Sequence, residues 1–455
     1  QSNGIPEQRI LPSGDLPSLL TVVDATSWSQ AELDTAVAGA AGYAFDLAGE
    51  LPLRATLFTT GPQECVLLLV MHHIAGDGWS MGPLARDLST AYSARVNNTE
   101  PSWTPLPVQY ADYTLWQREL LGDDNDPDSV AGQQLAYWRK TLADSPEELL
   151  LPTDRPRPAT PTHHGATIPL DIPAELHQHL TDLARTHNAT MFMVLQAALA
   201  TLLSKLGAGQ DIPIGTPIAG RTDENLNDLV GFFVNTLVLR TDLEGDPTFT
   251  QLLTRVREQS LTAYAHQDIP FERLVEDLAP TRSMARHPLF QVMLTLQNNQ
   301  QATLDLPGLA TQPVTATELP AKFDLDLHIS EQFGPDGQPA GLTTTLTYTT
   351  DLYDPETVNG FARRFTHVLQ QITAHPHTPV SHITLLDKEE QHQVLEEWNR
   401  TDVEVPSVTL PELFQTQAAQ TPEATAVVFA GDEISYGELN ARANRLARLL
   451  IQHGV

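Results

Sequence analysis

Cysteine and basic residues are scarce in this 455-residue chain, and each scarcity excludes a class of protein. Cys65 is the single cysteine, so no disulfide framework, zinc ribbon or paired-thiol redox motif can form. Lys and Arg number 26 against 57 Asp and Glu, which gives a net charge of −31. Such a charge repels nucleic acid and anionic membranes, so we expect neither as a partner. A single thiol also fits a reducing compartment, and we predict a cytoplasmic location.

Long hydrophobic runs are the second absence. No apolar run approaches the roughly 20 residues that a membrane-spanning helix needs, so we predict no membrane segment. The chain begins with Gln1-Ser2-Asn3-Gly4, which is neither a start methionine nor a signal peptide, and we interpret this as a cut inside a longer chain. Hydrophobic residues still make up 41% of the sequence, which is enough for ordinary folded cores.

The spacing of apolar residues predicts an α/β (α+β) protein with hairpins and amphipathic helices. Residues 53–60 and the apolar run 65–71 are predicted to pair as a hairpin, with the second strand buried. Ser80 is placed to cap the helix that follows. Further strands are predicted at 212–217, 231–240 and 290–296 and on both sides of a turn at 334–337, and further helices near 174–187, 192–206 and 249–266.

Changes in composition predict the domain boundaries. Four prolines within residues 151–161 indicate a stiff connector, so we predict a first lobe at 1–160 and a second at 161–385. Residues 386–408 are polar and charged, which is typical of an interdomain linker. A new pattern of helix, strand and helix occupies 409–455 and stops before it can complete a core.

The residues with the clearest chemical potential are His72 and His73, at the end of the predicted strand 65–71. A histidine there can accept a proton or hold a substrate by a hydrogen bond. Gly78 lets the backbone turn and a substrate approach, and Asp77 can brace the loop or orient a histidine. Adjacent strand residues point to opposite faces, so we predict no metal site at the pair. The alternative is a turn that only satisfies its own polar groups.

The run His72-His73-x-x-x-Asp77-Gly78 resembles the active-site motif of the condensation domains of nonribosomal peptide synthetases. Later segments resemble further motifs of that family, in matching order and spacing across residues 1–385. The resemblance implies two chloramphenicol acetyltransferase-like lobes forming a V-shaped pseudo-dimer. The matching segments are 110–118, 214–221, 231–236, 266–275, 287–291 and 323–325.

This resemblance implies an acyltransferase that forms a peptide (amide) bond. An upstream peptidyl carrier protein would present a donor acyl or peptidyl thioester, and a downstream one an acceptor aminoacyl thioester. Each substrate would hang on the carrier's 4′-phosphopantetheine, so no cofactor is expected on the domain itself. Close placement of the two arms can supply much of the rate, up to about 7–11 kcal/mol for well-oriented groups.

The resemblance also suggests roles for the motif. His73 is expected to meet the acceptor amine, as a general base or as a hydrogen-bond positioner, and His72 to pack into its lobe. Asp77 is expected to have a structural role, and Gly78 to leave room for substrate. The family's two opening motifs are not found in this chain, and the second carries the arginine that pairs with the motif's aspartate. We therefore expect Asp77 to lack that partner, which leaves open whether the chain is active by itself.

Three further residues are candidates for the wall of a substrate tunnel: Trp79, Arg221 and Asn235. Arg221 could support the second lobe or Asp77, and a surface salt bridge is the equally weighted alternative. Asn235 could hydrogen-bond an acyl chain or simply satisfy a backbone group. Trp116 is interpreted as core.

The last residues resemble a second family. Residues 434–444 are similar to the opening motif of adenylation domains, which activate an amino acid with ATP and Mg²⁺. The family's phosphate loop and catalytic lysine would lie beyond Val455, so only a complete adenylation domain would use ATP. An adenylation domain in the same chain is thus an expected partner.

Two alternatives share the expected fold. An epimerization domain has the two histidines but usually shows Ser-Trp after the motif, where this chain has Trp79-Ser80. A non-catalytic recruiting domain usually has a damaged motif, and this motif is intact. The wording of residues 77–82, Asp-Gly-Trp-Ser-Met-Gly, is more similar to domains that take an L-configured donor.

Overall fold

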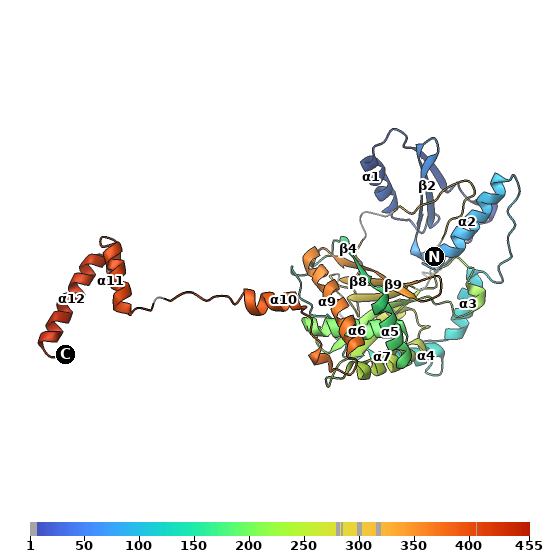
Figure 1. Cartoon of the computed structure of the whole chain (residues 1–455). Helices are drawn as coiled ribbons and strands as arrows, with labels where there is room; N and C mark the ends of the chain where they lie inside the picture. Colours follow the sequence, from blue (N-terminus) through green and yellow to red (C-terminus); the bar gives the residue numbers. More distant parts are fainter. Residues whose placement is uncertain (1–6, 279–282, 284, 298–302, 315–319, 406) are drawn as a thin grey trace. The chain divides into compact units, whose positions relative to one another are not determined.

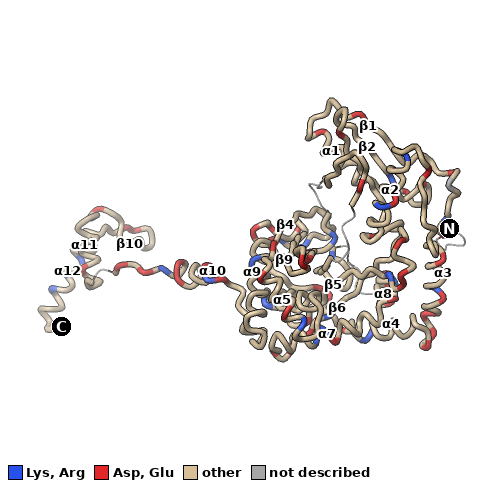
Figure 2. Tube along the Cα trace, turned by 45° about the vertical axis from the view of Figure 1, so that its right-hand side comes forward, with Lys and Arg blue, Asp and Glu red and all other residues tan. Residues whose placement is uncertain are grey.

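The computed structural model describes the whole chain except residues 1–6, 279–282, 284, 298–302, 315–319 and 406 (Figure 1). Its contacts divide the chain into two compact units, Gln1–Asp387 and Lys388–Val455, each described here by itself. Acidic residues are spread over all parts of the first unit (Figure 2).

The first lobe of unit Gln1–Asp387 contains a three-stranded sheet in the order β1-β2-β3. The predicted hairpin is present, because β2 pairs antiparallel with β3, and β1 pairs parallel with β2. Helix α1 covers one face, where Leu33 and Phe58 form a small core. The bounds are β1 Leu20–Asp24, α1 Gln30–Ala41, β2 Leu53–Gly61 and β3 Glu64–Met71.

The prediction that 65–71 is a buried strand is wrong. Leu67 and Leu69 of β3 are 39% and 41% exposed. Across β2, Leu20 and Val22 of β1 lie in register with them on the same face and are also exposed. Strand side chains alternate between faces, and α1 packs against Val66 and Leu68 on the other face. The continuous apolar run therefore correctly indicated a strand here, but it did not indicate that both faces of that strand are buried.

The second lobe is built on a six-stranded mixed sheet in the order β4-β9-β8-β7-β5-β6. Figure 1 labels β4, β8 and β9 of this sheet. A strand is found within or near each predicted segment, and β8 and β9 form the expected antiparallel hairpin. The strands are β4 Gly165–Ile172, β5 Asp211–Ile218, β6 Asn235–Asp242, β7 Val292–Gln297, β8 Leu325–Phe333 and β9 Pro339–Thr349.

Helices cover this sheet on one face, where alternating strand residues such as Leu294, Leu327 and Leu346 enter a large core. The helices of this layer are α5 Ala174–Thr186, α6 Met191–Leu203, α7 Phe249–Tyr264 and α9 Pro355–Ala374. The segment Met191–Ala208, which contains α6, is 18 residues long, and its hydropathy alone would suffice for a membrane span. The prediction that no apolar run approaches the length of a membrane span is corrected by this segment. However, 67% of the segment is buried in the fold, as in the core helix of a globular lobe.

Three helices connect the first sheet to the second: α2 Met81–Val96, α3 Tyr110–Leu121 and α4 Val130–Thr141. Although α4 precedes the proline-rich connector, its Leu135 and Trp138 are buried in one cluster with Leu237 and Phe290 of the second lobe. Helix α8, Phe271–Leu278, joins the same cluster through Leu274. Packing therefore groups α4 with the larger sheet.

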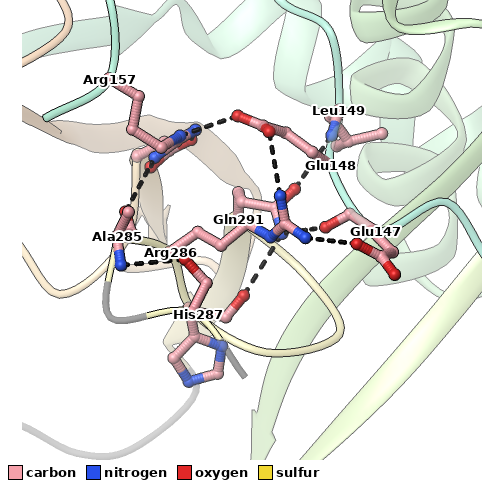
Figure 3. A network of polar contacts seen from close by, with 10 residues as sticks. Glu147, Glu148, Leu149, Arg157, Ala285, Arg286, His287 and Gln291 are labelled. Carbon is pink, nitrogen blue, oxygen red and sulfur yellow. Dashed lines mark hydrogen bonds and ion pairs between the residues drawn. The ribbon is translucent and has the colours of Figure 1, made fainter. Parts of the chain in front are cut away.

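The connector after α4 is attached to the second lobe by a network of ion pairs (Figure 3). Arg157 donates to both carboxylate oxygens of Asp324, at 2.8 and 2.5 Å, and to Glu148 at 2.7 Å. Arg286 donates to Glu147 and Glu148. Because most of these groups are shielded from water, the network holds the connector more firmly than surface pairs would.

Unit Lys388–Val455 has little core of its own. Its elements are α10 Lys388–His392, a π-turn at Gln393–Glu397, α11 Leu410–Gln420, the antiparallel pair β10 Thr425–Phe429 and β11 Asp432–Ser435, and α12 Tyr436–Gln452. Within the described residues of this unit, Ala418 is the one buried apolar side chain, while Leu410, Phe429 and Ile451 are largely exposed.

Limited proteolysis of the purified chain is expected to cut first at 399–405, where no helix or strand forms and Val403 and Val405 are exposed. The fragment 410–455 should then be digested rapidly, because about 46 residues rarely sustain a core. Mass spectrometry of timed digests would check the order. A tail that survives as long as residues 166–385 would contradict it.

Candidate active site

His72 is used within the first lobe. β3 ends at Met71, and a 3₁₀ turn, His73–Ala75, follows directly. The Nδ1 atom of His72 accepts a hydrogen bond from the Ile74 backbone N–H at 3.0 Å, and its ring meets the Phe45 ring edge to face. His72 thus packs within the first lobe.

The His73 side chain is exposed and has no polar partner among the described residues. Its ring lies 5.2 Å from the ring of Phe232, at an interplanar angle of 84°. Phe232 belongs to the second lobe, so the contact spans both lobes. The two ring nitrogens of His73 are thus available to a substrate, while one side of the ring is fixed by packing.

Asp77 is buried and bonded on both carboxylate oxygens. Oδ1 accepts from the Ser80 N–H at 2.9 Å, the Ser80 hydroxyl at 2.8 Å and Arg221 at 3.3 Å. Oδ2 accepts from the Phe233 N–H at 3.0 Å. Burial alone would raise the pKa of Asp77, but the hydrogen bonds from Ser80 and Phe233 and the charge of Arg221 lower it below its ordinary 3.8. Asp77 is therefore ionised at neutral pH.

Arg221 pairs with Asp77, which is one of the two supporting roles considered for it. It is a different arginine from the one that the family's second opening motif carries. Its side chain is 1% exposed, which also excludes the surface salt bridge. Besides Asp77, it donates to the Ser80 hydroxyl at 3.0 Å and to the Leu226 carbonyl, and its guanidinium lies 4.0 Å from the Phe233 ring centre. Desolvation lowers the pKa of Arg221, and the attraction of Asp77 opposes this shift.

Ser80 was missed as a site residue and predicted only as a helix cap. It does occupy the N-cap position of α2, but its side chain makes no capping bond. Its fully buried hydroxyl bonds instead to the carbonyl of Gly231 at 2.9 Å and to the N–H of Gly231 at 3.1 Å. Ser80 thereby attaches the start of α2 to the second lobe.

This attachment corrects the predicted strand 231–240. β6 begins only at Asn235, because Gly231 and Phe233 give backbone hydrogen bonds to Ser80 and Asp77 instead of to a neighbouring strand. The sequence signal that could have revealed this was Gly231 before two phenylalanines. An added Cβ at Gly231 would lie 2.3 Å from the Tyr110 ring, so only glycine fits there.

The other tunnel candidates lie at the same junction. The Trp79 indole N–H donates to the Asn227 carbonyl at 3.1 Å, and Gly78 is exposed. Asn235 donates to the carbonyls of Gln267 and Ile269 and accepts from Thr236 and Phe271. Its amide is fully used by backbone groups, which favours the second of the two roles considered for it.

A cavity of about 140 Å³ lies between α3 and the segment that carries Phe232. Both rings and polar groups line it: Tyr110, Tyr113, Trp116, Phe232, Asn235 and Asp268. The interpretation of Trp116 as core is wrong, because its ring is 45% exposed at the rim. Burial raises the pKa of Tyr113 to about 12, so its phenol stays neutral.

Gly231→Ala is expected to destabilise the protein by about 1–3 kcal/mol, the usual cost of overpacking, because the new methyl would push against Tyr110. Urea unfolding would measure the loss. Gly39→Ala in α1 is the matched control: apart from its chain neighbours and the helix's own nearby backbone, no atom lies within 4 Å of the new methyl. Alanine also favours a helix, so stability should hold or rise. Equal effects at both positions would contradict the assigned contact.

Among the described residues, no group of three or more His, Cys, Asp and Glu side chains is arranged to hold a metal ion. The groups that could act chemically are the accessible imidazole of His73 and the buried Asp77–Arg221 ion pair, at the junction of the two lobes.

Comparison with known proteins gives the family. A model of the condensation domain matches residues 1–395, and a model of the AMP-binding enzymes matches residues 414–455. The chain therefore belongs to the condensation domains of nonribosomal peptide synthetases, which are amide-forming acyltransferases, and continues into the start of an AMP-binding domain.

Two curated relatives match the whole chain. It is 53% identical to a probable nonribosomal peptide synthetase of Salinispora arenicola and 50% identical to a dimodular nonribosomal peptide synthase of Bacillus subtilis. It spans only 6% and 19% of their respective lengths.

Solved structures support the mixed α/β, chloramphenicol acetyltransferase-like fold. The X-domain from teicoplanin biosynthesis is 36% identical, with a TM-score of 0.76 and 82% of each chain covered. A four-domain nonribosomal peptide synthetase bound to AMP and glycine has a TM-score of 0.79 over 97% of this chain and 33% of that one. At 24% identity, this second likeness bears on the fold alone.

Proposed function

We propose that this chain joins a donor acyl or peptidyl thioester to an acceptor aminoacyl thioester, each presented by a peptidyl carrier protein on phosphopantetheine. The observation that supports this most is that Asp77 and His73 of the same motif have opposite surroundings. Asp77 is buried in an ion pair, while His73 stands exposed at a strand end with both ring nitrogens free.

In the proposed reaction, the acceptor's α-amine attacks the donor's thioester carbonyl. A C–N bond forms, the C–S bond breaks, and the amine's proton ends on the released carrier thiol. His73 can take the proton from the attacking nitrogen or hold that nitrogen by a hydrogen bond while the proton leaves. Holding both arms in place accounts for much of the rate in either case.

The other residues act on structure in this proposal. Asp77, Arg221 and Ser80 hold the two lobes together next to His73. Gly78 leaves the approach open, and Trp79 and Asn235 fix the walls through backbone contacts.

We further infer the setting of the reaction. Residues 1–160 and 161–385 would form the two lobes, 386–408 the linker, and 409–455 the start of the adenylation domain that supplies the acceptor. The L-configured donor and a cytoplasmic location belong to the same proposal, since the motif wording and the single cysteine favour them. ATP and Mg²⁺ would serve only the complete adenylation domain.

The test is transfer between loaded carriers. Radiolabelled donor on one carrier and aminoacyl acceptor on the other are mixed with the synthetase module that contains this chain, and amide on the downstream carrier is measured. Parallel reactions with L- and D-donors test the donor assignment. Epimerised donor without amide would instead identify an epimerization domain.

A recruiting role is the second candidate, because the X-domain from teicoplanin biosynthesis was also solved in a complex with OxyB and resembles this chain at 35% identity with a TM-score of 0.75. The intact His72-His73-x-x-x-Asp77-Gly78 run favours catalysis. Absence of both amide and epimerised donor, with both carriers loaded, would favour recruitment.

A further inference from the structure

We propose that Phe232 is a positioning residue for His73: the second lobe supplies the ring that sets the imidazole of the first. Nothing in the motif itself performs this task, because Asp77 bonds to Ser80, Arg221 and Phe233 and not to His73. Among the described residues, the aromatic ring in contact with His73 is that of Phe232, which lies 5.2 Å away and nearly perpendicular. Edge-to-face packing of this kind has a preferred geometry and so restricts ring rotation.

Phe232 is itself held on both sides. Gly231 before it is bonded through its N–H and carbonyl to the Ser80 hydroxyl, and Phe233 after it donates its N–H to Asp77. The Phe232 carbonyl accepts from the Tyr110 hydroxyl at 2.7 Å. Three consecutive residues of the second lobe are thus tied to Ser80, Asp77 and Tyr110, so the ring has little freedom.

The contacts that fix Phe232 come from the same motif that contains His73. Ser80 and Asp77 lie a few residues after His73 in the sequence, and through the second lobe's backbone they determine where Phe232 meets His73. The orientation of His73 then depends on the lobes being docked. This inference rests on the proposed function, because positioning matters only if His73 meets a substrate.

Phe232→Leu removes the ring and keeps an apolar side chain. The module carrying it is expected to show kcat lowered about 10- to 100-fold with KM for the loaded carriers little changed, since small misplacements of a reacting group have effects of this size. Phe232→Tyr keeps the ring and should restore kcat. Phe333→Leu is the matched control: that exposed ring also lies beside a histidine, 5.6 Å from His177, but far from the motif in sequence, and kcat should not change.

A second readout distinguishes positioning from general damage. Diethyl pyrocarbonate modifies accessible histidines, and mass spectrometry locates the products. In Phe232→Leu, His73 should react faster while exposed His164 and His328 keep their rates, and Phe232→Tyr should return His73 to the wild-type rate. Faster reaction at all histidines would mean general loosening and would overturn the proposal. So would a lowered kcat with unchanged His73 reactivity.

If Phe232→Leu does not fold, Ser80→Ala serves in its place, because it leaves the ring intact and frees Gly231. It should show the same paired change in kcat and His73 reactivity, and unchanged values would overturn the proposal. The two hypotheses can fail separately. A wild-type module that forms no amide refutes the proposed function, while the His73 reactivity of the variants still reports on the positional contact.

Discussion

Replacing His73 with alanine is expected to lower amide formation by about 10²- to 10⁴-fold, the usual contribution of a positioned acid or base. Both carriers should still load, because loading does not involve this residue. The physical reason is that His73 offers the two unpartnered, exposed ring nitrogens at the end of β3, beside the lobe junction. The measurement is the carrier-to-carrier transfer assay under single-turnover conditions.

Two companion variants sharpen this result. His164→Ala removes an exposed ring from the chain's other His-His pair, near the proline-rich connector, and should leave the rate unchanged. His73→Asn can still hydrogen-bond to the amine but cannot take its proton at neutral pH. Substantial activity in His73→Asn would identify a positioner, whereas equal loss in the asparagine and alanine variants would identify a general base. A wild-type rate in His73→Ala would remove His73 from the mechanism.

Asp77→Ala is expected to destabilise the protein by about 3–5 kcal/mol, because it leaves the Arg221 cation buried without its counter-charge. It also removes the acceptors of the Ser80 and Phe233 N–H groups. Urea unfolding at pH 7 would measure the loss. The double variant Asp77→Asn/Arg221→Gln, which removes both charges, should lose less than the sum of its two single variants. Additive losses would show that the pair is not coupled.

The same pair predicts a pH dependence. The pKa of Asp77 is lowered on folding, so its ionisation stabilises the folded state above the unfolded pKa of about 3.9. The difference in unfolding free energy between wild type and Asp77→Asn should therefore be constant at neutral pH and shrink as pH falls through the lowered folded pKa. A difference that stays the same down to pH 2 would contradict an ionised Asp77.

The elements of the second lobe were well predicted from the sequence. Along its strands and helices, apolar residues recur with the spacing expected when one face of the element is buried. β8 and α7 follow such patterns. Prediction failed where chain segments from different lobes meet. The start of β6 was placed four residues early because a hydrogen bond from Ser80 to Gly231 depends on tertiary contact, which periodicity does not encode. The burial of β3 failed for a related reason: a strand pattern does not say what covers each face.

The candidate site shows the same division. The histidines and Asp77 could be singled out from their spacing. Arg221 was named as one possible support of Asp77, 144 residues away in sequence, but only the fold brings the two together. Ser80 and Phe232 carried no chemical signal of their own, since a serine after a turn and a phenylalanine in an apolar run have ordinary local explanations.

The unequal cores of the two lobes have a consequence for cooperativity. The three-stranded sheet buries Ala25, Leu33 and Phe58 against α1, whereas the six-stranded sheet is packed into an extensive cluster of described residues. By itself the smaller lobe would open at a lower free-energy cost than the larger one. The hydrogen bonds of Ser80 to Gly231 and of Asp77 to Phe233 join the smaller lobe to the more stable one. Each local opening of the small sheet next to His73 must therefore also break contacts with the larger lobe. Amide protons near the motif should thus exchange more slowly with solvent than those of the outlying strand β1, although both belong to the same lobe.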